Sequence, residues 1–424
     1  MGPGPESDSQ VRVILAGLVG NVMEWYDFAI YGYFAVTIGN LFFPSDDPAV
    51  SLLSSFGAFA AGFLARPLGG IVFGRIGDII GRKRVLTLSV LAMAIPTTLI
   101  AFLPTYETIG IAAPILIILL RIIQGLSVGG EYTSSVVFLV ERAPPRRRAF
   151  FAIWGVWGAV LGVMMGSAVG DAISTILSDA EMADWGWRIP FLFGSLVAIT
   201  SLLVRRTITT DEGAGEGASP VISTFSKHSL TVVKVAALNV GQAVAFYAVF
   251  VYVVTYVKEI DHLPSATALD LNTGSMSLLL VLLPIAAWFS DVFGRRPMMI
   301  TGALIMTAGA VPLFLLIHST NPLFIFLGEV GFAVGLSVFI GGLCAANVEL
   351  LPTHVRCTGL AFAYNASIGV FGGLTPLIVT WLLTATGDPI SPAYWIAAAG
   401  AISLITSAFF YRDTRDTELE ASSP

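Results

Sequence analysis

Charged residues are scarce in this chain. Asp, Glu, Lys and Arg together make up 12% of the 424 residues, whereas a soluble domain has about 25%. The chain also has only 2 cysteines and 4 histidines, which gives no support to a disulfide framework or to a metal-binding cluster. The hydrophobic fraction is 55% and the mean hydropathy is +0.83. This composition excludes a large soluble domain and predicts a protein that crosses a membrane many times.

Several functional motifs are missing as well. The chain has no GxxxxGK[ST] phosphate-binding loop, so any uphill work must draw on an ion gradient instead of ATP. It has no Ser/His/Asp grouping that would favour a membrane enzyme. The net charge of −6 says little about partners in such an apolar chain, and nothing indicates nucleic acid. We therefore expect no enzyme activity, no metal and no cofactor.

Long apolar runs predict about twelve membrane-spanning helices. Their expected centres are Ala29, Gly62, Ala94, Gly125, Gly162, Gly194, Val244, Leu279, Gly309, Gly335, Phe371 and Gly400. When both termini are placed in the cytoplasm, every Lys or Arg falls in or beside a cytoplasmic segment except Arg66, Arg121, Arg188 and Lys258. That bias is the one that the positive-inside rule requires.

The chain also repeats itself at half its length. GRIGDIIGRKR, which follows the second span, is echoed by WFSDVFGRR after the eighth, and ERAPPRRR after the fourth span is echoed by ELLPTHVR after the tenth. The repeat predicts two six-helix halves, residues 1–206 and 229–424, joined by a Gly-, Ser- and acid-rich cytoplasmic linker at 207–228. The first pair of motifs predicts a cytoplasmic gate between helix ends, formed by Asp78, Arg82, Lys83, Asp291, Arg295 and Arg296.

Charged side chains inside the predicted spans need an explanation, because each costs at least about 2.5 to 3.5 kcal/mol at the centre of a bilayer. Glu24 and Asp27 lie on one face of the first span, Arg66 is in the second, and Arg121 and Glu131 are in the fourth. Opposite charges at similar depth favour pairing around a polar cavity. Two interpretations remain open: a transport site, or a satisfied buried network that only fixes helix positions.

These motifs resemble those of the major facilitator superfamily. GRIGDIIGRKR is similar to its loop motif, and RIIQG at 121–125 is similar to the fourth-helix motif of its proton-coupled members. GNVMEWYDF together with YNASIGVFGGLTP resembles the metabolite:proton symporter branch, which transports proline and betaine, 2-oxoglutarate, citrate or shikimate. The resemblance implies an all-α fold of twelve helices in two pseudo-symmetric halves. It also implies a multi-pass protein of the bacterial inner membrane.

Roles for individual residues follow from this resemblance and from the chemistry of the side chains. Asp27, Glu24 and Glu131 are candidates for carrying the proton, since burial and a nearby Arg change how readily a carboxylate binds one. Arg121 and Arg66 are candidates for holding a substrate carboxylate. The remaining candidates for substrate binding are polar or aromatic: Tyr31, Gln124, Asn239, Gln242, Tyr247, Tyr364 and Asn365. Each of the last five is more often ordinary packing, and an aromatic wall also suits a quaternary ammonium group.

The predicted function is proton-driven symport of a small organic carboxylate or zwitterion between the two halves. A proton-independent exchanger or facilitator of a similar metabolite is the alternative. The predicted partners are the small-molecule substrate, protons and the lipid bilayer, and a monomer is the simplest assembly. Glu329, the only acid well inside the second half, is either functional or a partner for polar groups near a helix end.

Overall fold

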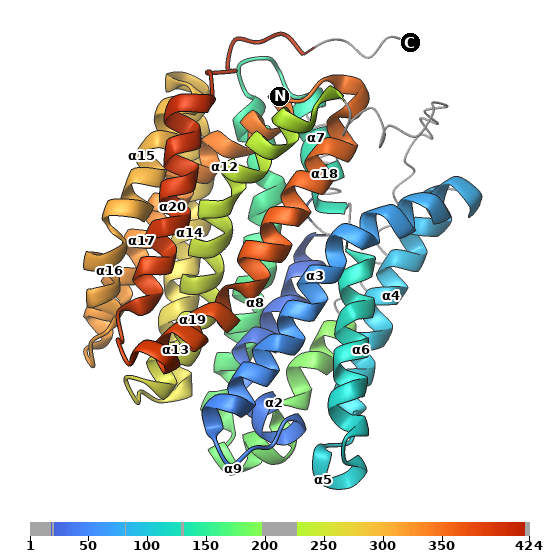
Figure 1. Ribbon diagram of the computed structural model, residues 1–424, viewed down its shortest axis with the longest axis vertical. Helices are drawn as coiled ribbons and strands as arrows, with labels where there is room; N and C mark the ends of the chain where they lie inside the picture. The colour runs from blue at the N-terminus through green and yellow to red at the C-terminus, as the bar shows by residue number, and fades with distance from the viewer. Residues whose placement is uncertain (1–17, 19–20, 81, 129–130, 197–226, 420–424) are drawn as a thin grey trace, which may run out of the picture.

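The structure, a computed structural model, describes residue 18 and residues 21–80, 82–128, 131–196 and 227–419. All secondary structure in this part of the chain is helical, and the long helices run side by side in one bundle (Figure 1). The first half contains a helical stretch at 21–33, followed by α2 (Ala35–Phe42), α3 (Pro48–Ile80), α4 (Arg82–Phe102), α5 (Tyr106–Ile109), α6 (Ala112–Ser127), α7 (Glu131–Arg142), α8 (Arg148–Ile176), α9 (Asp179–Glu181) and the π-helix η1 (Met182–Gly186). A further helical stretch covers 188–196.

The second half is built in the same way. Its elements are α12 (Ser229–Tyr247), η2 (Ala248–Tyr252), α13 (Val253–Glu259), α14 (Ser265–Phe293), α15 (Arg295–Ala308), α16 (Ala310–Ile317), α17 (Pro322–Glu349), η3 (Thr353–Val355), α18 (Arg356–Ser367), η4 (Ile368–Gly372), α19 (Gly373–Thr386), α20 (Ser391–Ile405) and η5 (Thr406–Phe410). The predicted linker at 207–228 lies almost entirely outside the described residues, so its boundaries stay a prediction.

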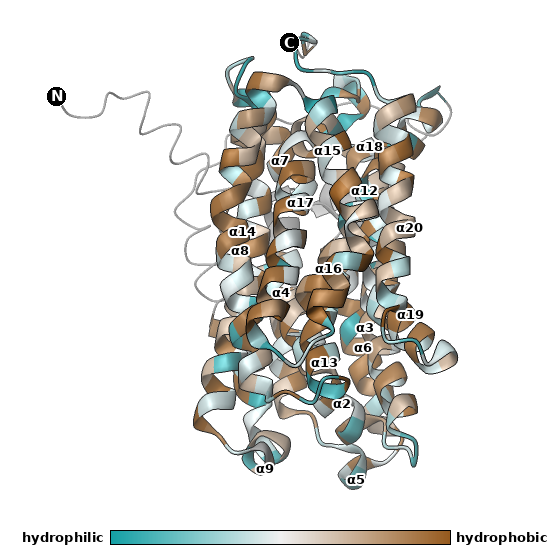
Figure 2. Ribbon diagram, turned by 90° about the vertical axis from the view of Figure 1, so that its left-hand side faces the viewer, coloured by the Kyte–Doolittle hydropathy of each residue, from teal (hydrophilic) through white to brown (hydrophobic). Residues whose placement is uncertain are grey.

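Eight helices of the described part are long and apolar enough to cross a membrane, and the bent pair α15 and α16 makes a ninth. The predicted first, third and sixth spans run into residues outside the described ranges or into a shorter apolar stretch. Every predicted centre except Gly309 nevertheless falls in helical backbone. The hydropathy colouring shows apolar residues along the outer faces of the bundle and polar ones at its ends (Figure 2).

The ninth span bends at Gly309. Helices α15 and α16 meet there at 55°. Pro312, in the first turn of α16, has no N–H to donate to the preceding turn, and glycine adds no side chain to bridge the gap. The predicted centre of the ninth span, Gly309, therefore falls where this helix breaks.

Glycines set the closest approaches between helices. A Cβ on Gly125 would collide with the backbone carbonyl of Gly62, so α3 and α6 touch backbone to backbone. In the same way, Gly158 and Gly162 of α8 lie against the backbone of the first helix at Leu18 and Val22. The first of these contacts brings together the two helices that carry Arg66 and Arg121. Gly158 and Gly162 therefore serve close packing of α8 against the first helix.

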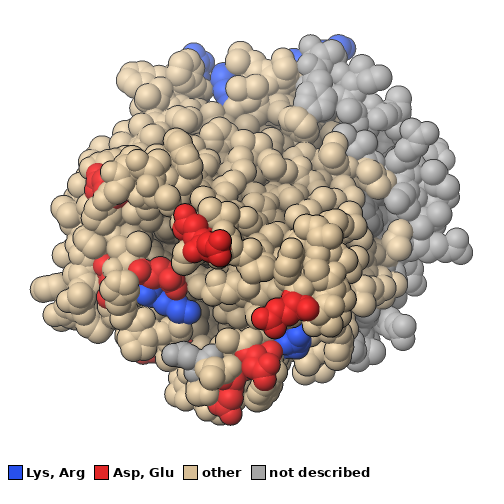
Figure 3. Space-filling model, turned by 60° about the horizontal axis from the view of Figure 1, so that its bottom comes forward, with Lys and Arg blue, Asp and Glu red and all other residues tan. Residues whose placement is uncertain are grey.

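The two ends of the bundle differ in the balance of charge that their described residues expose. One end, called here the basic end, includes the α14–α15 turn and exposes Arg142, Arg146, Arg147, Arg296 and Arg412. The other, called the acidic end, exposes Asp46, Asp47, Glu107, Glu181, Asp184, Glu259 and Asp270. Acidic side chains outnumber basic ones on the face that Figure 3 shows.

Candidate functional site

Two ion pairs lie buried at the centre of the first half. Arg66 Nη2 on α3 donates to Glu24 Oε1 at 2.7 Å, and Arg121 Nη1 on α6 lies 3.7 Å from Asp27 Oδ2. All four side chains are almost completely inaccessible to solvent. Burying a charge in this way is tolerated only when it is paired and hydrogen-bonded. The four charged groups that the sequence places in these spans therefore do meet.

Asp27 has further partners. Gln124 receives a hydrogen bond from Arg121 Nη1 at 2.9 Å and donates from its Nε2 to Asp27 Oδ2 at 2.7 Å. Thr97 Oγ1 lies 2.5 Å from Asp27 Oδ1 and 2.8 Å from the carbonyl oxygen of Met93. A hydroxyl has a single proton, so it can donate fully to only one of them. When Thr97 donates to Met93, its short contact with Asp27 needs a proton on the carboxyl group. The geometry thus accommodates both protonation states of Asp27.

The guanidinium groups are also enclosed by aromatic rings of the first half. Arg66 lies 5.4 Å from the ring centre of Trp25 and 5.2 Å from that of Phe63, while Arg121 lies 4.5 Å from Phe28 and 4.6 Å from Tyr31. Cation–π attraction at buried sites is worth about 2 kcal/mol or more. The rings keep water away from both arginines and orient them.

The second half reaches this centre through three of the predicted residues. The amide oxygen of Asn365 accepts a hydrogen bond from Arg66 Nε at 3.3 Å. Tyr247 stacks on Trp25 with ring centres 6.4 Å apart, and Tyr364 stacks on Tyr132 at 4.5 Å.

Two π-helical turns lie next to these residues. Tyr247 is followed directly by η2, and Asn365 precedes η4 by three residues. Single π-helical turns are frequent at functional sites.

Some donors at this centre have no acceptor within the part of the chain that the structure describes. They are Arg66 Nη1, Arg121 Nε and Nη2, Trp25 Nε1 and the Tyr247 hydroxyl. Buried polar groups are normally hydrogen-bonded, and leaving one unpaired costs about 1 to 3 kcal/mol. Groups of this kind, concentrated in one place and all able to donate, suit a ligand that brings acceptor oxygens.

The remaining predicted residues are placed differently. The ring of Tyr31 faces Arg121 at the centre, but its hydroxyl donates to the carbonyl of Ser55 at 3.3 Å. Asn239 and Gln242 bond to each other, and Asn239 also bonds to Asn347, all within the second half. Glu131, Asp78, Arg82 and Lys83 have side chains outside the described part of the chain, so their roles stay predictions.

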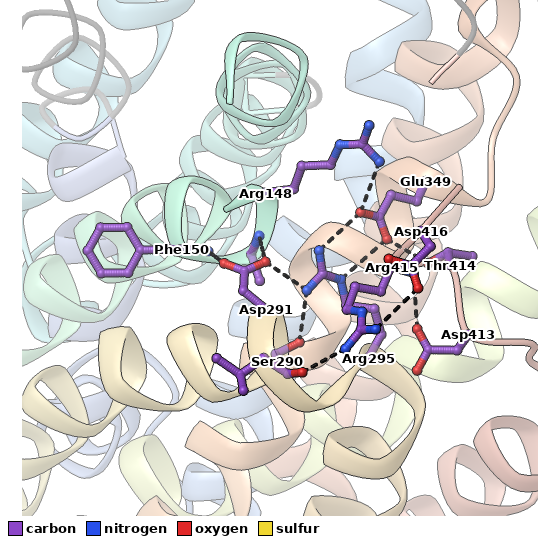
Figure 4. Close-up of polar contacts among 12 residues, drawn as sticks. Arg148, Phe150, Ser290, Asp291, Arg295, Glu349, Asp413, Thr414, Arg415 and Asp416 are labelled. Atoms are coloured by element: carbon purple, nitrogen blue, oxygen red, sulfur yellow. Dashed lines mark hydrogen bonds and ion pairs between the residues drawn. The ribbon is translucent and has the colours of Figure 1, made fainter. Parts of the chain in front are cut away.

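A second polar cluster closes the basic end (Figure 4). Asp291, at the end of α14, accepts hydrogen bonds from the backbone N–H groups of Ala149 and Phe150 at 3.1 and 2.9 Å. These are the second and third residues of α8, so a carboxylate of the second half caps a helix of the first, where free N–H groups and the helix dipole both favour an anion. Arg295 holds Asp291 in place at 2.8 Å.

Two ion pairs beside this cap cross between the halves. Arg356 Nη1 lies 2.6 Å from Glu141 Oε1, and Arg148 Nη1 lies 3.6 Å from Glu349 Oε1. Glu141 and Arg148 belong to one copy of the sequence repeat, and Glu349 and Arg356 to the other. Each acid therefore pairs with the arginine of the opposite copy. Arg296, predicted for this gate, instead contacts Ala408 and Asp413 within its own half.

Sequence reasoning missed five contributors to the centre: Trp25, Phe28, Phe63, Thr97 and Tyr132. Nothing in an apolar run marks a threonine as a carboxylate partner. The WYDF segment did hold a signal for Trp25, because this ring lies between two charged residues on the first span. The repeat identified the four residues of the crossed ion pairs, but it did not show which acid meets which arginine.

Comparisons with known proteins match nearly the whole length of the chain to transporters. The family model described as "Sugar (and other) transporter" matches residues 13–212 and 209–423. The proline/betaine transporter of Salmonella typhimurium is 35% identical over 429 residues, covering 97% of this chain and 85% of that protein. The glycine betaine/proline/ectoine/pipecolic acid transporter of Dickeya dadantii is 34% identical, with coverage of 97% and 85%.

Among solved structures, the chain is similar to the proton:xylose symporter XylE bound to 6-bromo-6-deoxy-D-glucose, with a TM-score of 0.76, 18% identity, and 98% of each chain covered. It is also similar to the inward open conformation of XylE from E. coli, with a TM-score of 0.73, 19% identity, and coverage of 97% and 98%. At such identities the likeness shows the fold alone. That fold is the predicted all-α arrangement of twelve helices.

Proposed function

Because the chain belongs to the family of sugar and other transporters within the major facilitator superfamily, we propose that it is a proton-coupled symporter of a small zwitterion. It is a multi-pass membrane transporter and not an enzyme. The class of substrate and the coupling to protons are the parts of this function that are proposed.

The observation that carries the proposal is the set of unpaired donors beside stacked aromatic rings. A substrate carboxylate accepts hydrogen bonds from Arg66 Nη1 and from the free nitrogens of Arg121, in the planar geometry that suits a carboxylate. The cationic end of the same molecule lies against Trp25 and Tyr247, whose rings meet between the halves. A zwitterion uses both features, whereas a dicarboxylate uses only the first. The names of the relatives, proline/betaine transporters, support the same class.

Asp27 is the residue proposed to carry the proton. Its contact with Thr97 accommodates a carboxylate or a carboxylic acid, and Gln124 links it to Arg121. Substrate binding to Arg121 weakens the attraction between this arginine and Asp27, which makes protonation of Asp27 easier. Glu24, already 2.7 Å from Arg66, is the second candidate.

The proposed orientation places the basic end in the cytoplasm, as the positive-inside rule requires. In a bacterium the membrane is the inner one, and both termini lie in the cytoplasm. Contacts cross between the halves at the basic end, at Asp291 and the two ion pairs, and release of substrate to the cytoplasm requires that these contacts break.

Uptake into proteoliposomes tests the function. A labelled panel of betaine, proline, 2-oxoglutarate, citrate and shikimate is offered with and without an inward proton gradient. We expect accumulation of a zwitterion, by about tenfold for each pH unit of gradient if one proton is carried per substrate. Uptake that ignores both the pH gradient and the membrane potential identifies an exchanger or facilitator, the alternative function.

Asp27→Asn distinguishes the two functions within the same assay. The variant should lose gradient-driven accumulation but keep exchange of labelled for unlabelled substrate. Asp47→Asn, at an exposed aspartate of the acidic end, is the matched control and should behave as wild type. Full accumulation of substrate by Asp27→Asn would contradict the assignment of Asp27 as the proton carrier.

A further inference from the structure

A further buried carboxylate lies near the acidic end of the bundle. Glu329 on α17 is 1% exposed, and among the described residues no Lys, Arg or His forms an ion pair with it. Its hydrogen-bond partner is Ser275 Oγ on α14, at 2.5 Å. Both helices begin at the acidic end, and Glu329 is the eighth residue of α17, roughly 10 Å along the helix from its start. An unpaired carboxylate at this depth is costly in its charged form.

The two contacts of the Ser275 hydroxyl indicate how Glu329 avoids the cost of burying a charge. Ser275 Oγ lies 2.9 Å from the carbonyl oxygen of Asn272, which is an acceptor only. If the single hydroxyl proton is donated to Asn272, the short contact with Glu329 is made by a carboxylic acid that donates to Ser275. Both short contacts are satisfied together only when Glu329 binds a proton.

The same segment of α14 joins the two halves. Asn272 Nδ2 donates to the hydroxyl of Tyr33 on the first helix and to Ser167 Oγ on α8, both at 3.1 Å. Tyr33 in turn donates to the carbonyl of Phe250 in η2 at 2.8 Å. These contacts, called here the outer latch, hold first-half and second-half helices together at the acidic end.

Ser275 connects the outer latch to Glu329, because its hydroxyl contacts both the Glu329 carboxyl group and the carbonyl oxygen of Asn272, whose side chain makes the latch contacts. The other ionisable groups on the helices that pack against α17 lie toward helix ends or farther along the bundle. On α8 and α14, Asp171 and Asp270 lie toward the acidic end, whereas Arg148 and Asp291 lie at the basic end. The remaining helices carry the following ionisable groups in the described residues: Glu141, Arg142, Lys234, Arg295, Arg296, Arg356 and Cys357 near the basic end, and Tyr132, Tyr247, Tyr252 and Tyr364 within the bundle. None of these forms a hydrogen bond or an ion pair with Glu329 in the described part of the chain.

We propose that Glu329 is a second proton-binding site, occupied when the outer latch is closed and emptied when Tyr33 and Ser167 separate from α14. Closing the latch buries the carboxyl group away from water, which favours the neutral form. Opening it admits water, which stabilises the charged form. Proton binding and closure of the acidic end are therefore linked, and each favours the other.

The test measures opening of the acidic end without substrate or gradient. Spin labels are attached to Glu107→Cys and Thr320→Cys, one in each half at the acidic end, in a Cys344→Ala, Cys357→Ser background in nanodiscs. Distances between the labels are recorded from pH 5 to pH 9. In the otherwise wild-type protein, the ratio of open to closed molecules should rise with pH, by at most about tenfold per pH unit for one proton.

Three variants identify the residue responsible. Glu329→Gln, whose amide donates to Ser275 as the acid does, should stay closed at all pH values. Ser275→Ala removes the partner and should displace the midpoint of the transition. Asp47→Asn, at an exposed aspartate of the acidic end, should retain the pH-dependent opening, because a different carboxylate controls it.

A Glu329→Gln protein that opens with pH as wild type does overturns the proposal, and so does a wild type that shows no change across the range. If Glu329→Gln does not fold, Ser275→Ala decides, and an unchanged midpoint counts against Glu329. Uptake assays are not involved, so failure of this proposal is distinct from failure of the proton-coupled symport assigned to Asp27.

Discussion

Removing the carboxylate of Asp291 should open the basic end. Asp291 makes two hydrogen bonds to the start of α8, at Ala149 and Phe150, and these bonds exist only while the halves are together. A hydrogen bond to a charged group contributes about 1.5 to 3 kcal/mol. Taking about 3 kcal/mol for the two together, Asp291→Ala should raise the ratio of open to closed molecules about a hundredfold. A protein that is 99% closed would then be close to half open.

Cys344 provides a native probe for this opening. It is buried on α17, which packs against α7 and α8 of the first half, whereas Cys357 is exposed. In a Cys357→Ser background, the rate at which maleimide labels Cys344 should rise by up to about a hundredfold in Asp291→Ala. Asp413→Asn is the matched control, because Asp413 accepts hydrogen bonds only from its own half in the described contacts. An unchanged labelling rate in folded Asp291→Ala protein would refute the assignment of Asp291 as a closing contact.

Other substitutions should have distinct effects. Glu141→Gln should raise the Cys344 labelling rate by less than about fivefold, since the Glu141 side chain is 41% exposed and such ion pairs are worth about 1 kcal/mol or less; a rise equal to that of Asp291→Ala contradicts this. Arg121→Lys should raise the KM for substrate uptake about tenfold or more by removing the planar fork, with an unchanged KM as the contrary result. Gly125→Ala should lower the Tm because its Cβ collides with the facing backbone at an overpacking cost of about 1 to 3 kcal/mol, whereas Gly57→Ala has open space and should not. Equal Tm values for the two glycine variants would show that α3 and α6 move apart enough to accommodate the added methyl group.

The sequence predicted the architecture because its signals are local and physical. Apolar runs of fixed length, interrupted by charges that a bilayer tolerates only when paired, located the spans and singled out Glu24, Asp27, Arg66 and Arg121. Depth along each helix then predicted that these charges meet, and the structure brings Glu24 to Arg66 and Asp27 to Arg121.

Contacts between halves were harder to predict, because they depend on how two helices from distant parts of the chain face each other. No feature of the sequence pairs Tyr364 with Tyr132 or places Asp291 at the start of α8. The residue type and position of Asn239 and Gln242 predicted that their amides bind substrate. In the structure the two amides bond to each other within the second half. Side-chain direction around a helix decides such cases, and an apolar helix with polar residues on several faces does not specify it.

The crossed ion pairs at the basic end have a consequence for how the two halves could have arisen. Each half carries one acid and one arginine at the same separation, Glu141 with Arg148 and Glu349 with Arg356, and each acid meets the other half's arginine. Such a surface is complementary to a rotated copy of itself. Two identical copies of one half could therefore have closed against each other as a dimer, before fusion joined them and allowed the two surfaces to diverge.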